Sequence, residues 1–284
     1  MEISGHFWGV GGIKLFYRGW MPQTPRAMLL FIHGAGEHSG HYRNIGEACL
    51  DQRIAFVCPD MRGFGQSGGA RGHVNNFTDY LEDLEALIQL FRAQYGSIPL
   101  FLFGHSFGGL IAIRYGQVFS HKAEGFILSS PALGLRFRIP YLFKKSLELI
   151  SNVFPDVSIQ PFKWARFLRI NRQLEAIFPG ESSMETMNDP FYTMEYTPRW
   201  LAELLRNGIH ALLEAPKFRF PLLCIYDKQD PIVHPGAIQQ FLDSVVFPDK
   251  QFVAFAEGFH KPWHPPHCQQ ALDNLMSWLN ARLQ

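Results

Sequence analysis

A serine flanked by glycines is the feature of this sequence best suited to chemistry. Ser106 lies in the segment Gly104-His105-Ser106-Phe107-Gly108, directly after the apolar run 100–103 and directly before a helix-like stretch at 110–115. Glycines two residues either side of the serine remove the Cβ clashes that a tight strand-to-helix turn would create. Such a turn lifts the hydroxyl clear of the backbone, and the pattern therefore predicts Ser106 as the nucleophile of a hydrolase.

Two later loops offer a base and an acid for this serine. A serine hydroxyl needs a base to remove its proton and a carboxylate to orient that base, and in α/β sheets such groups lie beyond the carboxyl ends of strands. The loop after the apolar run 222–226 offers Asp227 and Asp230, and the loop after the following strand offers His260. Asp227 lies close to the strand end, whereas Asp230 begins a turn with a proline. We therefore predict a triad of Ser106, Asp230 and His260.

The histidines that follow His260 give a second signal. His264 is a rival for the base, and His260 and His264 have the spacing of a metal-binding pair on a helix. Three prolines between residues 262 and 266 argue against a regular helix there. We therefore expect no metal ion and no other cofactor.

The oxyanion of an acyl-transfer intermediate also needs hydrogen-bond donors. One predicted donor is the N–H of Phe107, at the start of a helix, where an unpaired amide and the helix dipole both favour negative charge. The loop after the apolar run 28–32 reads His33-Gly34-Ala35-Gly36, and the N–H of Ala35 is the second predicted donor. We expect His33 to be buried and to hold this loop rather than to take part in catalysis.

Alternating apolar and amphipathic segments must position these groups. Short apolar runs alternate with longer amphipathic stretches near both ends of the chain, which predicts an α/β fold with a mainly parallel sheet covered by helices. The opening segment 7–17, broken by glycines, is typical of an antiparallel hairpin at the sheet edge. Strands are expected at 28–32, 54–58, 100–103, 125–128, 222–226 and 252–255, and helices at 42–52, 77–95 and through 272–279.

The alternation stops between Ser129 and Phe220. These roughly 90 residues far exceed an ordinary crossover between strands, so we predict an insertion with helices of its own. The expected organisation is a core in two parts, 1–130 and 215–284, interrupted by a helical cap at 131–214. Cap helices are expected at 140–154, 162–174 and 199–213.

Composition limits the class of protein. The 284 residues, 47% of them hydrophobic, provide ample material for a core, and the net charge of +1 gives no reason to expect a nucleic-acid partner. The first residues lack a signal-peptide pattern, and no apolar run approaches the roughly 18 residues that span a bilayer. Four well-separated cysteines without a CxxC pair indicate unpaired thiols and fit a reducing compartment. We therefore expect a cytoplasmic protein.

Three segments carry a resemblance to a known family. They are His33-Gly34-Ala35-Gly36-Glu37-His38-Ser39-Gly40-His41-Tyr42, Asp60-Met61-Arg62-Gly63-Phe64-Gly65-Gln66-Ser67-Gly68-Gly69 and Gly104-His105-Ser106-Phe107-Gly108-Gly109. With the late aspartate and histidine they resemble the α/β-hydrolase fold, and more narrowly its monoacylglycerol lipase and lysophospholipase branch. The Glu-His-Ser-Gly-x-Tyr extension of the first segment is not a general feature of hydrolases. Related dehalogenases and epoxide hydrolases have an aspartate in place of the serine and are excluded.

This resemblance implies the same triad, an oxyanion hole from Ala35 and Phe107, no metal, and a helical cap over a hydrophobic acyl tunnel. The chain departs from the family at Asp227, where a glycine is common, and at Lys261-Pro262-Trp263, after the histidine. We expect substrate contacts from the residue before the nucleophile and from the cap. These are His105, Leu142, Phe143 and Trp164.

The expected function is hydrolysis of a single-chain lipid ester, either a monoacylglycerol or a lysophospholipid, through an acyl-enzyme on Ser106. With the same triad, the alternatives are an acyl thioesterase and a hydrolase of small esters or C–C bonds. A catalytically silent hydrolase-fold binding protein is the alternative from another class, although such proteins usually lack a triad member.

The cap has a polarised charge distribution. Residues 136–172 carry eight Lys or Arg against two acids, a net +6, and residues 173–205 carry six acids against one Arg, a net −5. With the aromatic residues among them, the basic half is suited to resting on an anionic membrane surface and admitting a lipid. The alternative is a solvated helix face whose aromatic side chains pack on the core.

Overall fold

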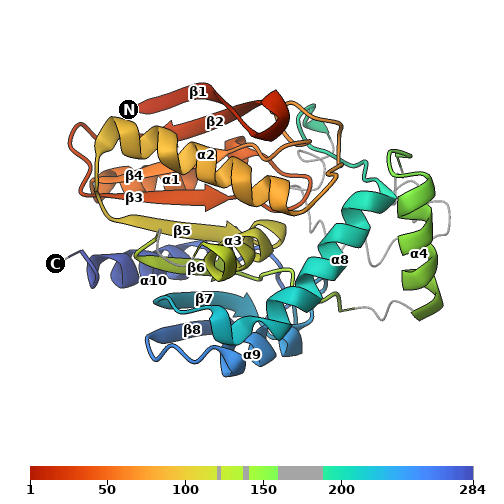
Figure 1. The fold of residues 1–284 in the computed structure, drawn as a ribbon. Coiled ribbons are helices and arrows are strands. Elements are labelled where there is room, and N and C mark those ends of the chain that lie inside the picture. Colours follow the sequence, from red (N-terminus) through yellow and green to blue (C-terminus); the bar gives the residue numbers. More distant parts are fainter. Residues whose placement is uncertain (120–122, 137–140, 159–187, 284) are drawn as a thin grey trace.

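A twisted sheet of eight strands forms the centre of the protein in the computed structural model, which describes residues 1–119, 123–136, 141–158 and 188–283, without the side chains of 141–144 (Figure 1). The strand order is β1-β2-β4-β3-β5-β6-β7-β8. Strands β3 to β8 run parallel, whereas β1 and β2 form an antiparallel hairpin at one edge, as the sequence predicted. The strands are β1 Glu2–Trp8, β2 Lys14–Trp20, β3 Ala27–Ile32, β4 Ile54–Pro59, β5 Leu100–His105, β6 Gly125–Ser129, β7 Leu222–Asp227 and β8 Lys250–Phe255.

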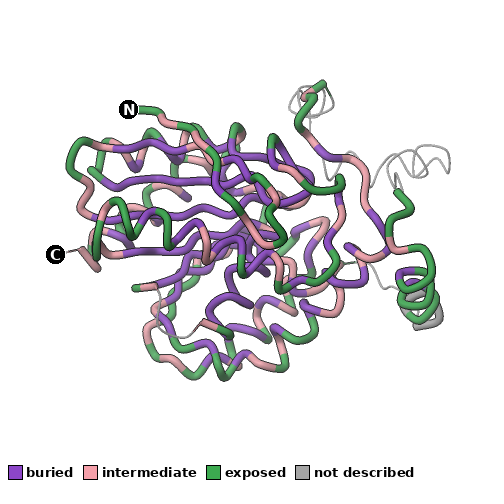
Figure 2. Tube along the Cα trace, turned by 45° about the horizontal axis from the view of Figure 1, so that its top comes forward, coloured by how far each residue is buried: buried purple, intermediate pink, exposed green. Residues whose placement is uncertain are grey.

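Helices cover both faces of this sheet. One hydrophobic cluster lies between the sheet and α2, α3, α8 and α9, and a second lies between the opposite face and α1 and α10. Every residue of β3 to β7 is buried, which explains why these strands appear in the sequence as continuous apolar runs (Figure 2). The helices are α1 Arg43–Asp51, α2 Thr78–Tyr95, α3 Phe107–Val118, α9 Pro235–Ser244 and α10 Cys268–Asn280, with α4 Tyr141–Val153 and α8 Pro198–Leu213 in the inserted region.

The inserted region lies beyond the carboxyl ends of the parallel strands (Figure 1). Helix α8 begins at Pro198 after Thr197, whose hydroxyl caps it by accepting from the N–H of Trp200, and it packs against both α3 and α4. Helices α4 and α8 agree with the predictions at 140–154 and 199–213. The helix predicted at 162–174 lies outside the described residues.

One core helix, α9, was not predicted from the sequence. The four cysteines are unpaired, as the sequence predicted. Within the described part of the chain, no helix is long and apolar enough to cross a membrane.

Candidate active site

The turn that carries Ser106 is fixed by close backbone packing. Ser106 joins β5 to α3 with a φ of 52°, and its N–H donates to the carbonyl of Ser129 at 2.8 Å. A Cβ on Gly104 would lie 2.2 Å from the carbonyl oxygen of Gly108, and a Cβ on Gly108 would lie 2.0 Å from that of Ile32. Only glycine fits at these two positions, so the strained turn is imposed by its surroundings.

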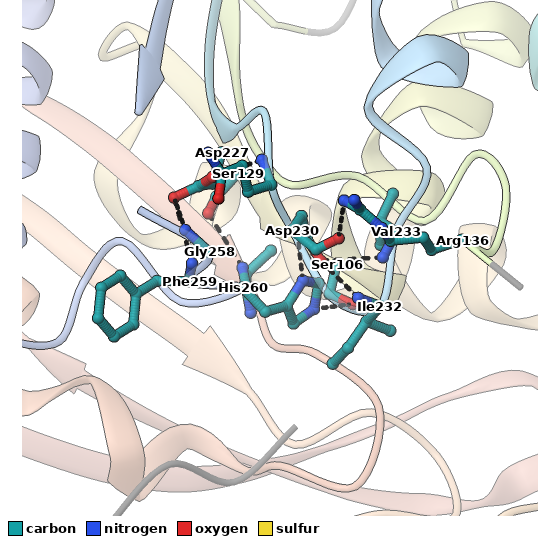
Figure 3. Close-up of polar contacts among 12 residues, drawn as sticks. Ser106, Ser129, Arg136, Asp227, Asp230, Ile232, Val233, Gly258, Phe259 and His260 are labelled. Carbon is teal, nitrogen blue, oxygen red and sulfur yellow. Dashed lines mark hydrogen bonds and ion pairs between the residues drawn. The ribbon is translucent and has the colours of Figure 1, made fainter. Parts of the chain in front are cut away.

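His260 connects this serine to a carboxylate. Its Nε2 lies 2.9 Å from the Oγ of Ser106, and its Nδ1 lies 2.7 Å from Oδ2 of Asp230 (Figure 3). The rival His264 is exposed and makes neither of these contacts. The structure therefore brings together the three residues predicted from the sequence, in an arrangement that suits proton transfer from serine to histidine.

Asp230 is fully buried and is held by its own turn. Its Oδ1 accepts from the N–H groups of Ile232 and Val233 at 2.8 and 2.9 Å. Burial opposes ionisation, but His260 and these two amides outweigh it, so the pKa of Asp230 lies below its ordinary value. The carboxylate is therefore ionised at neutral pH and orients the imidazole.

The turn that carries Asp230 is also bonded to the first part of the inserted region. Leu135 forms an antiparallel bridge with Val233, the N–H of Arg136 donates to the carbonyl of Ile232, and a guanidinium N–H of Arg136 donates to the carbonyl of Asp230 at 2.8 Å. Residues 134–136, which we call the cap root, thus lie against the acid.

Asp227 does not contact His260. It is 2% exposed, and its Oδ2 accepts from the N–H groups of Glu257, Gly258 and Phe259 at 2.9–3.1 Å (Figure 3). Of the two aspartates that the sequence offered, the structure places Asp230, the one predicted for the triad, against His260; the sequence indicated no role for Asp227. The departure from the family at this position was the available signal.

The loop after β3 supplies the other side of the site. Phe107, as the first residue of α3, has an N–H without an intrahelical acceptor, and Ala35 lines the pocket beside Ser106. His33 is fully buried, accepts from the N–H of Met61 at 2.9 Å, and has its Nδ1 2.7 Å from the carbonyl of Gly34, so it holds the loop as expected.

Glu37 anchors this loop from within. One oxygen accepts from the N–H of Gly34 at 2.9 Å and from the hydroxyl of Tyr42, and the other forms an ion pair with Lys261. Burial disfavours the charged form, but Lys261 and nearby histidines outweigh it, so the pKa of Glu37 lies well below its ordinary value. Because Lys261 follows His260, this ion pair links two loops. They are residues 33–38, which carry the predicted donor Ala35 and which we call the oxyanion loop, and residues 256–267, which carry His260 and which we call the base loop.

A pocket of about 160 Å³ opens at Ser106. His105 lines it, but this side chain is only 1% exposed, and burial lowers its pKa to about 3, so the ring is neutral. Tyr192 and Tyr196, just before α8, also line the pocket and were missed by the sequence analysis. The side chains of Leu142 and Phe143, and all of Trp164, lie outside the described residues.

A second polar cluster joins the oxyanion loop to the segment before α8. Nε2 of His38 and Nε2 of His41 lie 2.7 and 2.9 Å from Oδ2 of Asp189. Among the described residues, these three side chains form the group whose arrangement resembles a metal site. However, Nδ1 of His38 accepts from the N–H of Gly40, so its Nε2 carries a proton. A metal at Nε2 needs the opposite tautomer, and the cluster therefore fits a hydrogen-bonded junction better than a metal site.

The fold and the residues at its carboxyl edge define an α/β hydrolase of the serine type. The chain belongs to the family described as serine aminopeptidase, S33, whose model matches residues 23–266.

Several known proteins are similar to this chain in sequence or in fold. The human monoglyceride lipase is 32% identical over 254 residues, which cover 81% of this chain and 83% of that relative. The Bacillus subtilis phospholipase YtpA is 28% identical over 254 residues, with 87% and 92% covered. The crystal structure of the Paleococcus ferrophilus monoacylglycerol lipase has the same fold, with a TM-score of 0.82, 23% identity, and coverage of 94% of this chain and 99% of that one.

Proposed function

We propose that this chain hydrolyses single-chain lipid esters, either monoacylglycerols or lysophospholipids, through an acyl-enzyme on Ser106. The observation that carries the proposal is the position of His260, which contacts both the Ser106 hydroxyl and the buried Asp230 at the mouth of a pocket. The names of the relatives, a monoglyceride lipase and a phospholipase, support a lipid ester as the substrate.

In this mechanism His260 removes the proton of Ser106 as the hydroxyl attacks the ester carbonyl. The N–H groups of Ala35 and Phe107 stabilise the oxyanion, and Asp230 stabilises the imidazolium. His260 then protonates the leaving alcohol. Water, activated by the same histidine, attacks the acyl-enzyme and releases the fatty acid. Both half-reactions use this chain's own groups and no cofactor.

The charges in the pocket favour an ester over a peptide with a free amino terminus. An aminopeptidase has to bind the α-ammonium of its substrate with acceptors near the nucleophile. Here the carboxylate of Glu37 is already engaged by Gly34, Tyr42 and Lys261, so it is not free to bind an ammonium.

The test combines labelling with hydrolysis of matched substrates. A fluorophosphonate probe should label the wild type at Ser106, and the enzyme should release oleate from 1-oleoylglycerol or 1-oleoyl-lysophosphatidylcholine. Ser106→Ala should lower turnover by at least about 10⁴-fold. Faster hydrolysis of oleoyl-CoA or of p-nitrophenyl acetate would favour the thioesterase or the small-ester alternative. Absence of labelling would indicate a silent binding protein.

We also propose that the basic half of the cap rests on anionic membranes. Helix α4 and the residue after it, within this half, expose apolar side chains, with Leu149 65%, Val153 59% and Phe154 58% exposed. These would enter the headgroup region while the basic residues contact anionic lipids. Charge reversal at Lys144, Lys145, Arg166 and Arg169 should abolish co-sedimentation with anionic vesicles, and unchanged binding would contradict the proposal.

A further inference from the structure

The loop that carries the base has almost no regular backbone structure. Residues 256–267, between β8 and α10, form neither strand nor helix. A catalytic histidine must nevertheless be held to a fraction of an ångström, because small misplacements cost large factors in rate. Something other than secondary structure has to position His260.

Asp227 meets this need by filling a nest of backbone amides. Three successive N–H groups, those of Glu257, Gly258 and Phe259, converge on its Oδ2 at 3.0, 2.9 and 3.1 Å. Gly258 has a φ of +87°, and this left-handed conformation turns the neighbouring amides toward one point. In the part of the chain that the structure describes, these amides have no other acceptor. The nest ends one residue before His260.

The same carboxylate also shapes the turn that carries the acid. Its Oδ1 accepts from the N–H of Gln229 at 2.7 Å, and the carbonyl of Asp227 accepts from the N–H of Asp230 at 3.2 Å. Asp227 is the last residue of β7, so its backbone is fixed by the sheet. One side chain therefore ties the acid-bearing turn and the base-bearing loop to the same strand end.

We propose that Asp227 is a positioning residue that sets the relative placement of His260 and Asp230. The inference rests on the proposed function, in which His260 acts as the base. It also accounts for the departure at Asp227. In this chain the carboxylate at that position fills the nest, which a glycine has no side chain to do.

The test compares Asp227→Gly and Asp227→Asn with a control variant at a similarly buried aspartate. Asp83→Asn disrupts another buried carboxylate, 1% exposed, which binds Arg62 and the N–H of Val10 away from the triad. Turnover is expressed per active site titrated with a fluorophosphonate, so loss of folded protein does not count. We expect kcat to fall about 100-fold in Asp227→Gly and about tenfold in Asp227→Asn, with KM changed less than kcat. Asp83→Asn should lower Tm and keep kcat within about twofold.

Proton NMR gives a readout that does not depend on turnover. The Nδ1–H that His260 shares with Asp230 should give a low-field resonance in the wild type and in Asp83→Asn, and Asp227→Gly should shift it upfield or abolish it. If kcat per site and this resonance are both unchanged in Asp227→Gly, the inference is wrong. If the wild type shows the resonance but hydrolyses no ester, the proposed function fails while the positioning role stands.

Discussion

The turn that carries Ser106 and the base loop meet where Nε2 of His260 lies 2.9 Å from the Oγ of Ser106. Different physical forces hold the two segments in place. The turn at Ser106 is fixed by excluded volume, because backbone atoms pack where the Cβ atoms of Gly104 and Gly108 would be. The base loop is fixed by charge, since the carboxylates of Asp227 and Glu37 hold the residues on either side of His260. The turn at Ser106 therefore tolerates no added atom at its glycines, whereas the position of the base loop depends on the ionisation of these carboxylates.

The largest effect should come from adding one methyl group to the turn. In Gly108→Ala the new Cβ would lie 2.0 Å from the carbonyl oxygen of Ile32, which is backbone and has no room to move. We expect a loss of more than about 4 kcal/mol of folding free energy, and little folded protein in a thermal melt. A variant with a wild-type Tm would show that excluded volume does not hold the turn.

Breaking the ion pair at the base loop should have the next largest effect. Lys261→Met leaves the carboxylate of Glu37, whose side chain is 3% exposed, without its countercharge. The expected cost is about 3 kcal/mol in a urea titration. Adding Glu37→Gln should recover more than half of this loss, because no buried charge then remains. A double variant no more stable than the single one would contradict the electrostatic explanation.

The same methyl group should cost far less in the base loop. At Gly258 the nearest atom to a new Cβ is 3.8 Å away, so the penalty comes only from the φ of +87°. We expect Gly258→Ala to lose about 1–2 kcal/mol and to remain folded. This variant is the direct counterpart of Gly108→Ala, and equal losses at the two sites would remove the distinction between the two regions.

Acid should destabilise the protein through the buried carboxylates of Asp230 and Glu37, which contact His260 and Lys261 of the base loop. The pKa values of Asp230 and Glu37 are lowered in the folded protein, so their stabilising contribution is present above the ordinary carboxyl values and is lost as pH falls below about 4, through the lowered pKa values. The free energy of unfolding of the wild type should therefore fall over this window. The Glu37→Gln, Lys261→Met double variant should show a shallower fall, and parallel curves would argue against a role for Glu37.

The difference between steric and polar positioning also explains which parts of the site could be predicted from the sequence. The glycine spacing around Ser106 is a local consequence of sterics, so the turn was predicted from one short segment. The order of the late strands was enough to select Asp230 and His260, since parallel strands end at the same edge. The nest at Asp227 joins side chain to backbone across 30 residues or more, and such contacts leave no periodic pattern.

Helix α9 and the two pocket tyrosines were not predicted from the sequence for other reasons. Helix α9 has a proline in its first turn and buried residues at Ile238, Phe241 and Leu242, but glutamines and a glycine dilute its apolar pattern. The available signal was a proline followed by apolar residues at helical spacing, three and four positions apart. Tyr192 and Tyr196 reach the pocket only because the segment before α8 folds back over the oxyanion loop, where Thr193 donates to the carbonyl of Gly36.

The contacts of the cap root limit where a foreign cap can be joined to this protein. Residues 134–136 are bonded to the turn of Asp230, so the insertion begins on the catalytic framework and not on a neutral linker. Grafting a foreign cap to change the range of substrates should therefore join the chains after Arg136. A junction placed two residues earlier would exchange the part of the insertion that supports the acid, and activity would be lost together with the old specificity.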